Sequence, residues 1–456
     1  GYNALTSDTL GSTSTAIGYA ALETQNFTSA TDSYNTAVGY NAGTAVTTGT
    51  NNTLIGGLAG DATTTGGDNV AVGHTAFGAN TTGASNVALG AFALDANTTA
   101  SNNTAVGTSS LGANTTGAGN TGIGRVALLA NTTGADNVAL GYRALNANTT
   151  ANNNTAVGKD ALYVNTTGHN NTAVGTASLD ANLTGIENVA LGSSSLSGNT
   201  TGSENVAVGQ GALFANTTAS YNTAVGKSAL VTNTTGASNT ALGTDALQAN
   251  TTASENTAVG YQAGYTNTTG TKNVAVGAYS LGDNTTGDNN VAVGRQALKY
   301  NTTANNNTAV GYQSLQVNTT GDTNVAVGKD SMLANTTGTN NTAVGARSLQ
   351  SNTTAANNVA VGDLALGANT TGHGNIGIGV SALTANTTGI SNVAVGYLAA
   401  DAQAGNANYN VAIGAEALST NTLGSQNVAI GRSALIAFNV TSAAATYNTA
   451  VGDQAG

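Results

Sequence analysis

The chain has 456 residues, 61 of them Gly, with 7% charged residues and a formal net charge of −11. It contains no Cys, which excludes disulfide frameworks and thiolate metal sites. An acidic chain with scattered Lys and Arg lacks the basic pattern of a nucleic-acid-binding protein. No stretch approaches the roughly 18 consecutive apolar residues that would predict a membrane span.

One 17-residue unit organises the chain, and a good copy runs from Asn137 to Asn153. Asn137 is defined as position 1 and Asn153 as position 17. Self-similarity at a short fixed period is typical of solenoids, and this unit is too short for a pair of helices. The whole chain, residues 1–456, is therefore predicted to be a single repeat array.

In chain order, the array begins with a longer coil of 21 residues at 14–34, continues as regular 17-residue coils over 35–409, and contains a second 21-residue coil at 427–447. Residues 1–43 align without a gap on 414–456, with 24 identical pairs. This match predicts a second period of 413 residues, as in a segment of a longer fibre.

Each position of the unit accepts a narrow set of residues. Position 1 is Asn from Asn35 onward, position 3 is Ala or Gly except for Leu54, position 5 is always Gly, and position 9 is usually Leu. Position 12 is Asn in 19 consecutive copies, from Asn80 to Asn386. All ten Lys and Arg fall at positions 6, 7, 10 or 17. We expect positions 1–5, 8, 9 and 12–15, which carry no charge, to be buried or stacked.

The pattern predicts an all-β fold, a parallel β-solenoid (β-roll) of about 26 stacked coils at the inter-strand spacing of about 4.8 Å. Positions 1–4 are rich in Val, Thr and Ile and predict a strand, and positions 8–14 predict a second extended stretch. In-register Asn can form side-chain amide ladders, and Gly at position 5 suits a positive φ. The predicted structural ladder residues of two successive coils are Asn137, Gly141, Asn148, Asn154, Gly158 and Asn165.

The strand at positions 1–4 also predicts self-assembly. Positions 2 and 4 point to one side and position 3 to the other, yet residues on both sides are uncharged and largely apolar. A strand that is apolar on both faces is usually buried on both faces. We therefore expect a second copy of the chain to cover the small Ala column at position 3, and we favour a homotrimer.

No constellation of catalytic residues is visible, so the sequence predicts neither an enzyme nor a cofactor. The three His residues, His74, His169 and His373, lie in distant coils and cannot converge. The Gly-Gly-x-Gly-x-Asp pattern of calcium-binding rolls is missing.

Three surface features leave binding functions open. Asn-x-Thr at positions 12–14 matches the N-glycosylation sequon, as at Asn80, Asn97 and Asn114, although an Asn ladder is the favoured interpretation. Tyr recurs at position 6, together with Lys and Arg, and an exposed column of these residues can stack on sugars or acidic surfaces. Regular Thr columns raise an ice-binding alternative. The candidate surface-binding residues are Tyr142, Tyr261, Tyr312 and Tyr397.

The tandem motif Asn-[Thr/Val]-Ala-Val-Gly-x-x-[Ala/Ser]-Leu, as in residues 171–179, resembles the head repeats of YadA-like trimeric autotransporter adhesins and is similar to repeat shafts of phage tail fibres. The resemblance covers nearly the whole chain. It implies a left-handed parallel β-roll, three chains side by side and an adhesive role. The 17-residue unit is longer than the usual head repeat.

Together these observations predict a non-enzymatic fibre segment or adhesin shaft, located outside the cell, on its surface or on a virion. The expected partner is another copy of the chain, with host surfaces or glycans as further candidates. The alternatives are an ice- or glycan-binding module and an inert matrix or sheath filament. The variability of positions 6, 7, 10, 16 and 17 favours a scaffold.

Overall fold

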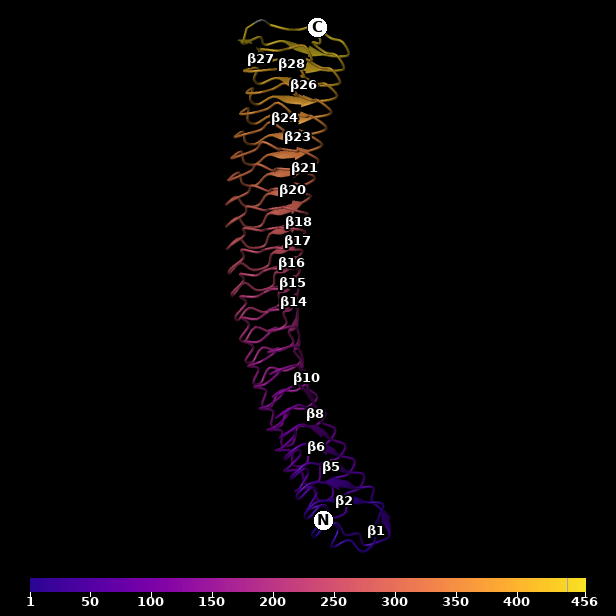
Figure 1. Ribbon diagram of the computed structural model, residues 1–456. Helices are drawn as coiled ribbons and strands as arrows, with labels where there is room; N and C mark the ends of the chain where they lie inside the picture. Colours follow the sequence, from indigo (N-terminus) through magenta and orange to yellow (C-terminus); the bar gives the residue numbers. More distant parts are fainter. Residues whose placement is uncertain (441) are drawn as a thin grey trace. The chain divides into compact units, whose positions relative to one another are not determined.

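The computed structural model describes residues 1–440 and 442–456 and divides into two compact units, Gly1–Asn222 and Thr223–Gly456. In each unit the chain winds through successive coils that stack on one another (Figure 1). The predicted fold class is confirmed: the chain is an all-β parallel solenoid of about 26 turns of ~17 residues, and no helix occurs among the described residues.

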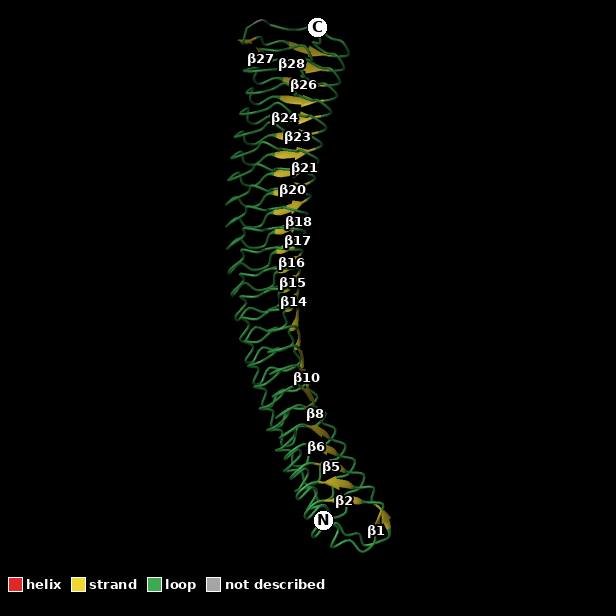
Figure 2. Cartoon of the chain, viewed as in Figure 1, coloured by secondary structure: helices red, strands yellow, loops and turns green. Residues whose placement is uncertain are grey.

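Each regular coil contains one three-residue strand at positions 2–4, and turns and loops form the rest of the coil (Figure 2). In the first unit the strands are β1 Gly11–Ser12, β2 Thr15–Ile17, β3 Thr31–Asp32, β4 Thr36–Val38, β5 Thr53–Ile55, β6 Val70–Val72, β7 Val87–Leu89, β8 Thr104–Val106, β9 Thr121–Ile123, β10 Val138–Leu140, β11 Thr155–Val157, β12 Thr172–Val174, β13 Val189–Leu191 and β14 Val206–Val208. In the second unit they are β15 Thr223–Val225, β16 Thr240–Leu242, β17 Thr257–Val259, β18 Val274–Val276, β19 Val291–Val293, β20 Thr308–Val310, β21 Val325–Val327, β22 Thr342–Val344, β23 Val359–Val361, β24 Ile376–Ile378, β25 Val393–Val395, β26 Val411–Ile413, β27 Gly424–Ser425, β28 Val428–Ile430, β29 Ala444–Ala445 and β30 Thr449–Val451.

Successive strands within each unit pair in parallel and in register. Ala139 of β10 lies opposite Ala156 of β11, which lies opposite Ala173 of β12. Backbone bonds continue outside the strands: Val138 N donates to Asn154 O of the next coil, and Gly141 N donates to Ile123 O of the preceding coil, both at 2.8 Å. Every equivalent residue therefore forms a column along the stack.

Position 3 lies inside its own coil. Ala139 is fully buried together with Ala144 and Leu145, at positions 8 and 9. The expectation that a second chain must cover the Ala column is therefore wrong, because the column is part of the core of a single chain. The side chains that remain exposed on this strand are those of positions 2 and 4, such as Val138 and Leu140, which the absence of charge had predicted to be buried.

The core keeps its volume where position 3 carries Leu instead of Ala or Gly. Leu54, the exceptional residue at position 3, is accompanied by Gly43 and Gly60 at position 9, where Leu is usual. A Cβ at Gly43 would lie 2.6 Å from Leu54 Cδ1, and one at Gly60 would lie 2.8 Å from Leu54 Cδ2. One large inward side chain thus takes the space of two others, as close packing requires.

Positions 8–14 do not form the predicted extended stretch. The chain there runs through turns, and residues at positions 7, 9 and 17 of the sample coil have positive φ: Arg143 58°, Leu145 50° and Asn153 59°. Non-Gly residues rarely adopt this region. Inter-coil backbone bonds hold them there, as from Leu145 N to Ala161 O at 2.9 Å.

Gly at position 5 has the positive φ that its invariance predicted, 137° at Gly141 and 132° at Gly158. The close approach of neighbouring coils gives a second reason for Gly. A Cβ on Gly141 would lie 2.5 Å from the carbonyl oxygen of Gly158. Position 5 is therefore closed to any side chain by both conformation and space.

The two 21-residue coils each take part in an additional two-residue parallel pair. β1 pairs with β3 through Gly11 and Thr31, and β27 pairs with β29 through Gly424 and Ala444. Both positions differ by 413 residues between the two pairs, the same shift that aligns the ends of the sequence. Thr441, within the second long coil, lies outside the described residues.

Candidate functional surfaces

The Asn residues at position 12 form a buried side-chain ladder. Asn148 Nδ2 donates to Asn131 Oδ1 of the preceding coil at 2.7 Å and to Ala151 O of its own coil at 3.0 Å. Asn148 Oδ1 in turn accepts from Asn165 Nδ2 at 3.2 Å. Equivalent bonds run from Asn80 to Asn216 in the first unit and from Asn233 to Asn386 in the second. The ladder ties each coil to both neighbours through groups that are fully removed from water.

The Asn residues at position 1 form a second ladder that meets the first at a shared carbonyl. Asn120 Oδ1 accepts from Asn137 N at 3.0 Å and from Asn137 Nδ2 at 3.1 Å. Asn137 Nδ2 also donates to Ala151 O at 2.9 Å, the same oxygen that accepts from Asn148. Asn154 repeats the backbone bond to Asn137 Oδ1 at 3.0 Å. Position 15 lies between the two Asn columns, which explains why it carries only Gly or Ala.

The sequon residues Asn80, Asn97 and Asn114 belong to the position 12 ladder and are 0% exposed. Asn97 Nδ2, the atom that a glycan would occupy, donates to Asn80 Oδ1 at 3.1 Å and to Ala100 O at 3.0 Å. A sugar on this nitrogen would remove a donor and would need space inside the coil. The folded chain therefore gives a glycosyltransferase no access to these three residues.

The two Thr columns differ in exposure. At position 13 the hydroxyl is already used, since Thr132 Oγ1 donates to Thr149 O of the next coil at 3.0 Å. At position 14, Thr133 and Thr150 are exposed. A single exposed Thr column therefore follows the stack in the regular coils.

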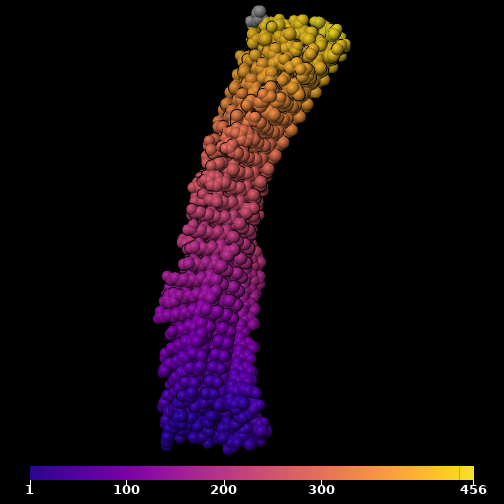
Figure 3. Space-filling model, turned by 45° about the vertical axis from the view of Figure 1, so that its right-hand side comes forward, coloured from indigo at the N-terminus to yellow at the C-terminus, as the bar shows by residue number. Residues whose placement is uncertain are grey.

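The outer strand face, defined as positions 2 and 4, is free of charge and ranges from half-buried to exposed. Position 4 is Val, Leu or Ile in every coil, whereas position 2 is Val or Ile in some coils and Thr in others, as at Val138 and Thr155. Val138 is 39% exposed and Leu140 is 44% exposed. Similar exposure recurs along both units, at Val87, Leu89, Leu191, Leu242, Val293, Val310, Val344, Val361, Ile378 and Ile413. The coils of each unit lie directly against one another (Figure 3). Because successive strands pair in register, the side chains of position 4 follow one another in a column along each stack.

Position 6 places aromatic and cationic side chains on the surface. The four candidate surface-binding residues are all exposed: Tyr142 by 39%, Tyr261 by 46%, Tyr312 by 40% and Tyr397 by 56%. Near the beginning of the chain, the rings of Tyr2, Tyr19 and Tyr40 stack with centroids 5.7 and 5.5 Å apart. In-register coils thus bring side chains 17 or 21 residues apart into direct contact.

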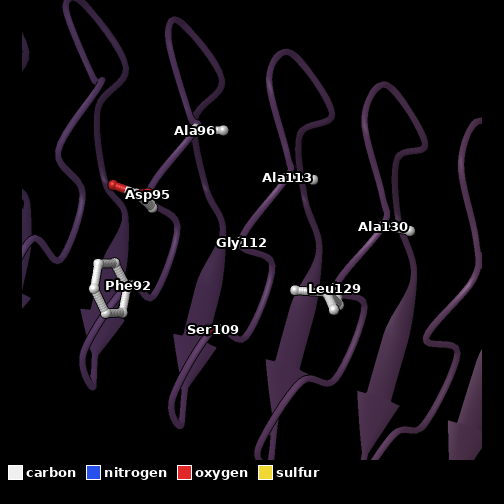
Figure 4. Close-up of a pocket in the computed structure, with 8 residues that line it drawn as sticks. All are labelled: Phe92, Asp95, Ala96, Ser109, Gly112, Ala113, Leu129 and Ala130. Atoms are coloured by element: carbon white, nitrogen blue, oxygen red, sulfur yellow. The ribbon is translucent and has the colours of Figure 1, made fainter.

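A shallow hollow of about 550 Å³ lies over the coils that begin at Asn86, Asn103 and Asn120. It arises at position 10, where Gly112 stands between Asp95 and Leu129 and leaves a gap one coil wide (Figure 4). Phe92, which makes an edge contact with His74 at 5.6 Å, forms one side. Burial raises the pKa of the Asp95 carboxyl above its ordinary value, and burial raises that of Asp61 as well, with a smaller contribution from the charge of Asp95.

The described residues do not bring together three side chains of the kinds that hold a metal ion. His74 contacts Phe92 at the surface, and His169 and His373 are exposed. The described residues contain no helix that is long and apolar enough to cross a membrane.

No known family model matches the chain, and no curated protein sequence matches it. The resemblance to adhesin heads and tail-fibre shafts thus depends on the tandem motif and on the repeated-coil fold, which is of the kind expected for a repeat fibre. The features that sequence reasoning missed are the left-handed residues at positions 7 and 9 and the outward direction of positions 2 and 4. The larger size of the side chains at positions 2 and 4, compared with Ala or Gly at position 3, was the available signal for the direction of this face.

Proposed function

We propose that the chain is a structural segment of an extracellular fibre whose copies pack together through the outer strand face, with a homotrimer as the favoured assembly. The observation that carries this proposal is the charge-free outer strand face, in which position 4 forms an unbroken column of Val, Leu and Ile. Monomeric proteins rarely expose contiguous apolar patches larger than a few hundred Å². A shaft of this kind serves adhesion or mechanical support because its stacked coils hold their exposed side chains at a fixed spacing along the fibre.

The available area is large enough for a stable interface. With side chains such as Val138 and Leu140 exposed by 39% and 44%, a coil of this kind offers about 100 Å² of apolar surface, and a coil with Thr at position 2 offers about half as much. A dozen successive coils would then bury about 900 Å² per partner, which exceeds the roughly 800 Å² of a standard protein interface. A second copy is the favoured occupant because its identical coil spacing keeps the columns in phase along the whole contact.

The proposal is tested by the mass of the purified chain in solution, measured by multi-angle light scattering. The expected mass is near three times 44.2 kDa. Replacing three residues of the outer strand face by Lys, in the variant Leu89→Lys/Leu140→Lys/Leu191→Lys, should weaken the assembly, because buried unpaired charges are strongly unfavourable. The variant should dissociate to the mass of a single chain at a protein concentration at which the wild type remains assembled.

A matched control separates this effect from general loss of apolar surface. Phe92, Leu183 and Phe214 are exposed by 43%, 42% and 46%, close to the 45%, 44% and 44% of the three face residues, but lie at positions 7, 13 and 10. The triple Lys variant of these residues should keep the assembled mass. A wild-type chain that is monomeric at every concentration tested would contradict the proposed assembly.

A further inference from the structure

Two groups of basic and aromatic side chains stand out on this acidic, charge-poor chain. Along position 6, the triplet Arg125, Tyr142 and Lys159 occupies three successive coils, and Arg295, Tyr312 and Lys329 repeat it 170 residues later. The first cationic patch consists of Arg125, Tyr142, Arg143, Lys159, Asp160 and Tyr163. The second consists of Arg295, Lys299, Tyr300, Tyr312, Lys329 and Asp330. Together they contain six of the ten Lys and Arg residues.

In the first patch, charged and aromatic neighbours hold Tyr142 in place. The Arg143 guanidinium carbon lies 5.0 Å from the centre of the Tyr142 ring and 4.7 Å from that of Tyr163. Arg143 also forms a two-point ion pair with Asp160, at 2.6 and 2.9 Å. Its charge is therefore largely used within the protein, and its role is to position the ring.

The other two cations of the first patch extend into solvent. Arg125 is exposed and lies 5.8 Å from the Tyr142 ring centre. The Lys159 side chain is 61% exposed and approaches Asp160 only at 3.9 Å. The surface thus presents a cation, an aromatic ring and a second cation in line along the stack.

The second patch repeats this arrangement in the other unit. Arg295 lies 5.9 Å from the Tyr312 ring centre, and the Lys329 side chain is 67% exposed and 3.8 Å from Asp330. Lys299 adds a further cation, with its Nζ 4.6 Å from the Tyr300 ring centre and 3.1 Å from the Tyr300 hydroxyl. The same order of cation, ring and cation is thus built twice from different neighbouring residues.

The spacing of the cations defines the ligand that they fit. Arg125 and Lys159 lie two coils apart, which places their backbones about 10 Å apart along the stack, with the Tyr142 ring between them. Two linked pyranose rings span a similar length. A linear polysaccharide with one carboxylate on every second sugar would place successive anions at the two cations and the face of an uncharged sugar over the Tyr ring.

We propose that each cationic patch binds an acidic polysaccharide that carries one anionic group per disaccharide and runs parallel to the solenoid axis. Denser polyanions fit less well. Nucleic acid carries a phosphate about every 3.4 Å along each strand, and most of its charges would face a chain with a net charge of −11. The inference goes beyond the proposed structural role and does not need assembly, because each patch lies within one unit and uses position 6 rather than the outer strand face.

The test measures binding of the full chain to hyaluronate, whose carboxylates alternate with neutral sugars, by biolayer interferometry at low and physiological salt. The variant Arg125→Gln/Lys159→Gln/Arg295→Gln/Lys329→Gln should weaken binding about tenfold or more, since each exposed charge contact contributes modestly. Tyr142→Ala/Tyr312→Ala should weaken binding at both salt concentrations, and its share of the loss should be larger at physiological salt, where the charges are more strongly screened. Far-UV circular dichroism and solution mass check that fold and assembly are unchanged.

A control variant of the same position type isolates the patches. Lys227 and Arg432 also lie at position 6 but outside both groups, so Lys227→Gln/Arg432→Gln should leave hyaluronate binding within about twofold of wild type. The comparison is with Arg125→Gln/Lys159→Gln, which removes two cations of the first patch. Equal loss of hyaluronate binding in the two double variants would overturn the proposal. Absence of hyaluronate binding by the wild type, or tighter patch-dependent binding of a single-stranded oligonucleotide, would also overturn it.

Discussion

Gly141 tests the close stacking of coils most directly. In Gly141→Ala the added methyl would lie 2.5 Å from the carbonyl oxygen of Gly158 and 2.7 Å from its carbonyl carbon. The residue must also keep a φ of 137°, where an L side chain is strained by about 1–3 kcal/mol. Relief of the contact requires the two coils to separate, which stretches the 2.8 Å bond from Gly158 N to Leu140 O.

The strain and the loss of about one inter-coil hydrogen bond, at roughly 1 kcal/mol, together predict a local destabilisation of about 3 kcal/mol. Because coils of a solenoid contact mainly their neighbours, the effect should remain local. Hydrogen exchange measured by mass spectrometry should show faster exchange, by about 100-fold, for the amides of β10 and β11. Strands several coils away should exchange as in the wild type.

Gly112→Ala is the matched control for this prediction. Gly112 lies at position 10, where the added methyl would lie 3.3 Å from both Leu129 Cδ1 and Ser109 O and where φ is not positive. Its exchange should stay within a few-fold of wild type, because a shift of a few tenths of an ångström relieves both contacts. Equal exchange in Gly141→Ala and Gly112→Ala would refute the argument that position 5 is closed by its neighbouring coil.

Three further predictions concern the ladders, the core and the buried carboxylates. Asn148→Ala should destabilise the chain by about 2–4 kcal/mol, since it leaves Asn131 Oδ1 buried without its donor. Asn152→Ala also removes an inter-coil bond, from Ala135 N to Asn152 Oδ1 at 2.7 Å, but at an exposed residue where water can replace it, so it should cost about 1 kcal/mol or less. Urea unfolding compares the two variants, and equal midpoints would argue against the buried ladder. Leu54→Ala should lower the free energy of unfolding by about 2–5 kcal/mol. Adding Gly60→Leu should recover part of this loss, because Gly60 has a φ of 57°, close to the φ that Leu adopts at position 9 elsewhere. Additive losses in a double-mutant cycle would contradict the idea that the two side chains share one volume. The pKa of Asp95 is raised in the folded state, so the folded chain binds the proton more strongly than the unfolded chain and stability falls as pH rises through and above the ordinary value of 3.8. Asp95→Asn should therefore raise the melting temperature at pH 7 but not below pH 3.8. An equal change at both pH values would exclude the buried charge of Asp95 as the cause.

The fold could be predicted from sequence because one short period repeats with little variation. Asn at positions 1 and 12 and Gly at position 5 each fit one geometric role, so the recurrence of residues such as Asn148 and Gly141 is enough to indicate stacked coils. The stretch at positions 8–14 could not be predicted in the same way. Leu145 has no intrinsic preference for a φ of 50°, and inter-coil bonds override its local propensity.

The surfaces were less predictable than the fold. The alternation of positions 2 to 4 established that Ala139 opposes Val138 and Leu140, but two uncharged faces gave no means of deciding which was inside. Side-chain volume decides it: the thin interior of a coil accepts Ala at position 3, and the larger residues face outward. The column at position 6 was correctly expected at the surface, whereas the pairing of Arg143 with Asp160 across coils depends on side-chain geometry that the repeat pattern does not specify.

The uniform register also determines which genetic changes the chain tolerates. Removal of residues 137–153 would join Asp136 to Asn154. Each remaining coil would still stack on a coil whose residues stand in the same positions of the unit, since Val138 and Thr155 occupy equivalent sites in the sheet. Removal of 16 residues would instead shift every later side chain by one place and expose Leu and Asn residues that now form the core. Unequal recombination in steps of one unit can therefore lengthen or shorten each stack without new contacts, so length can vary among related genes while the coil itself stays constant.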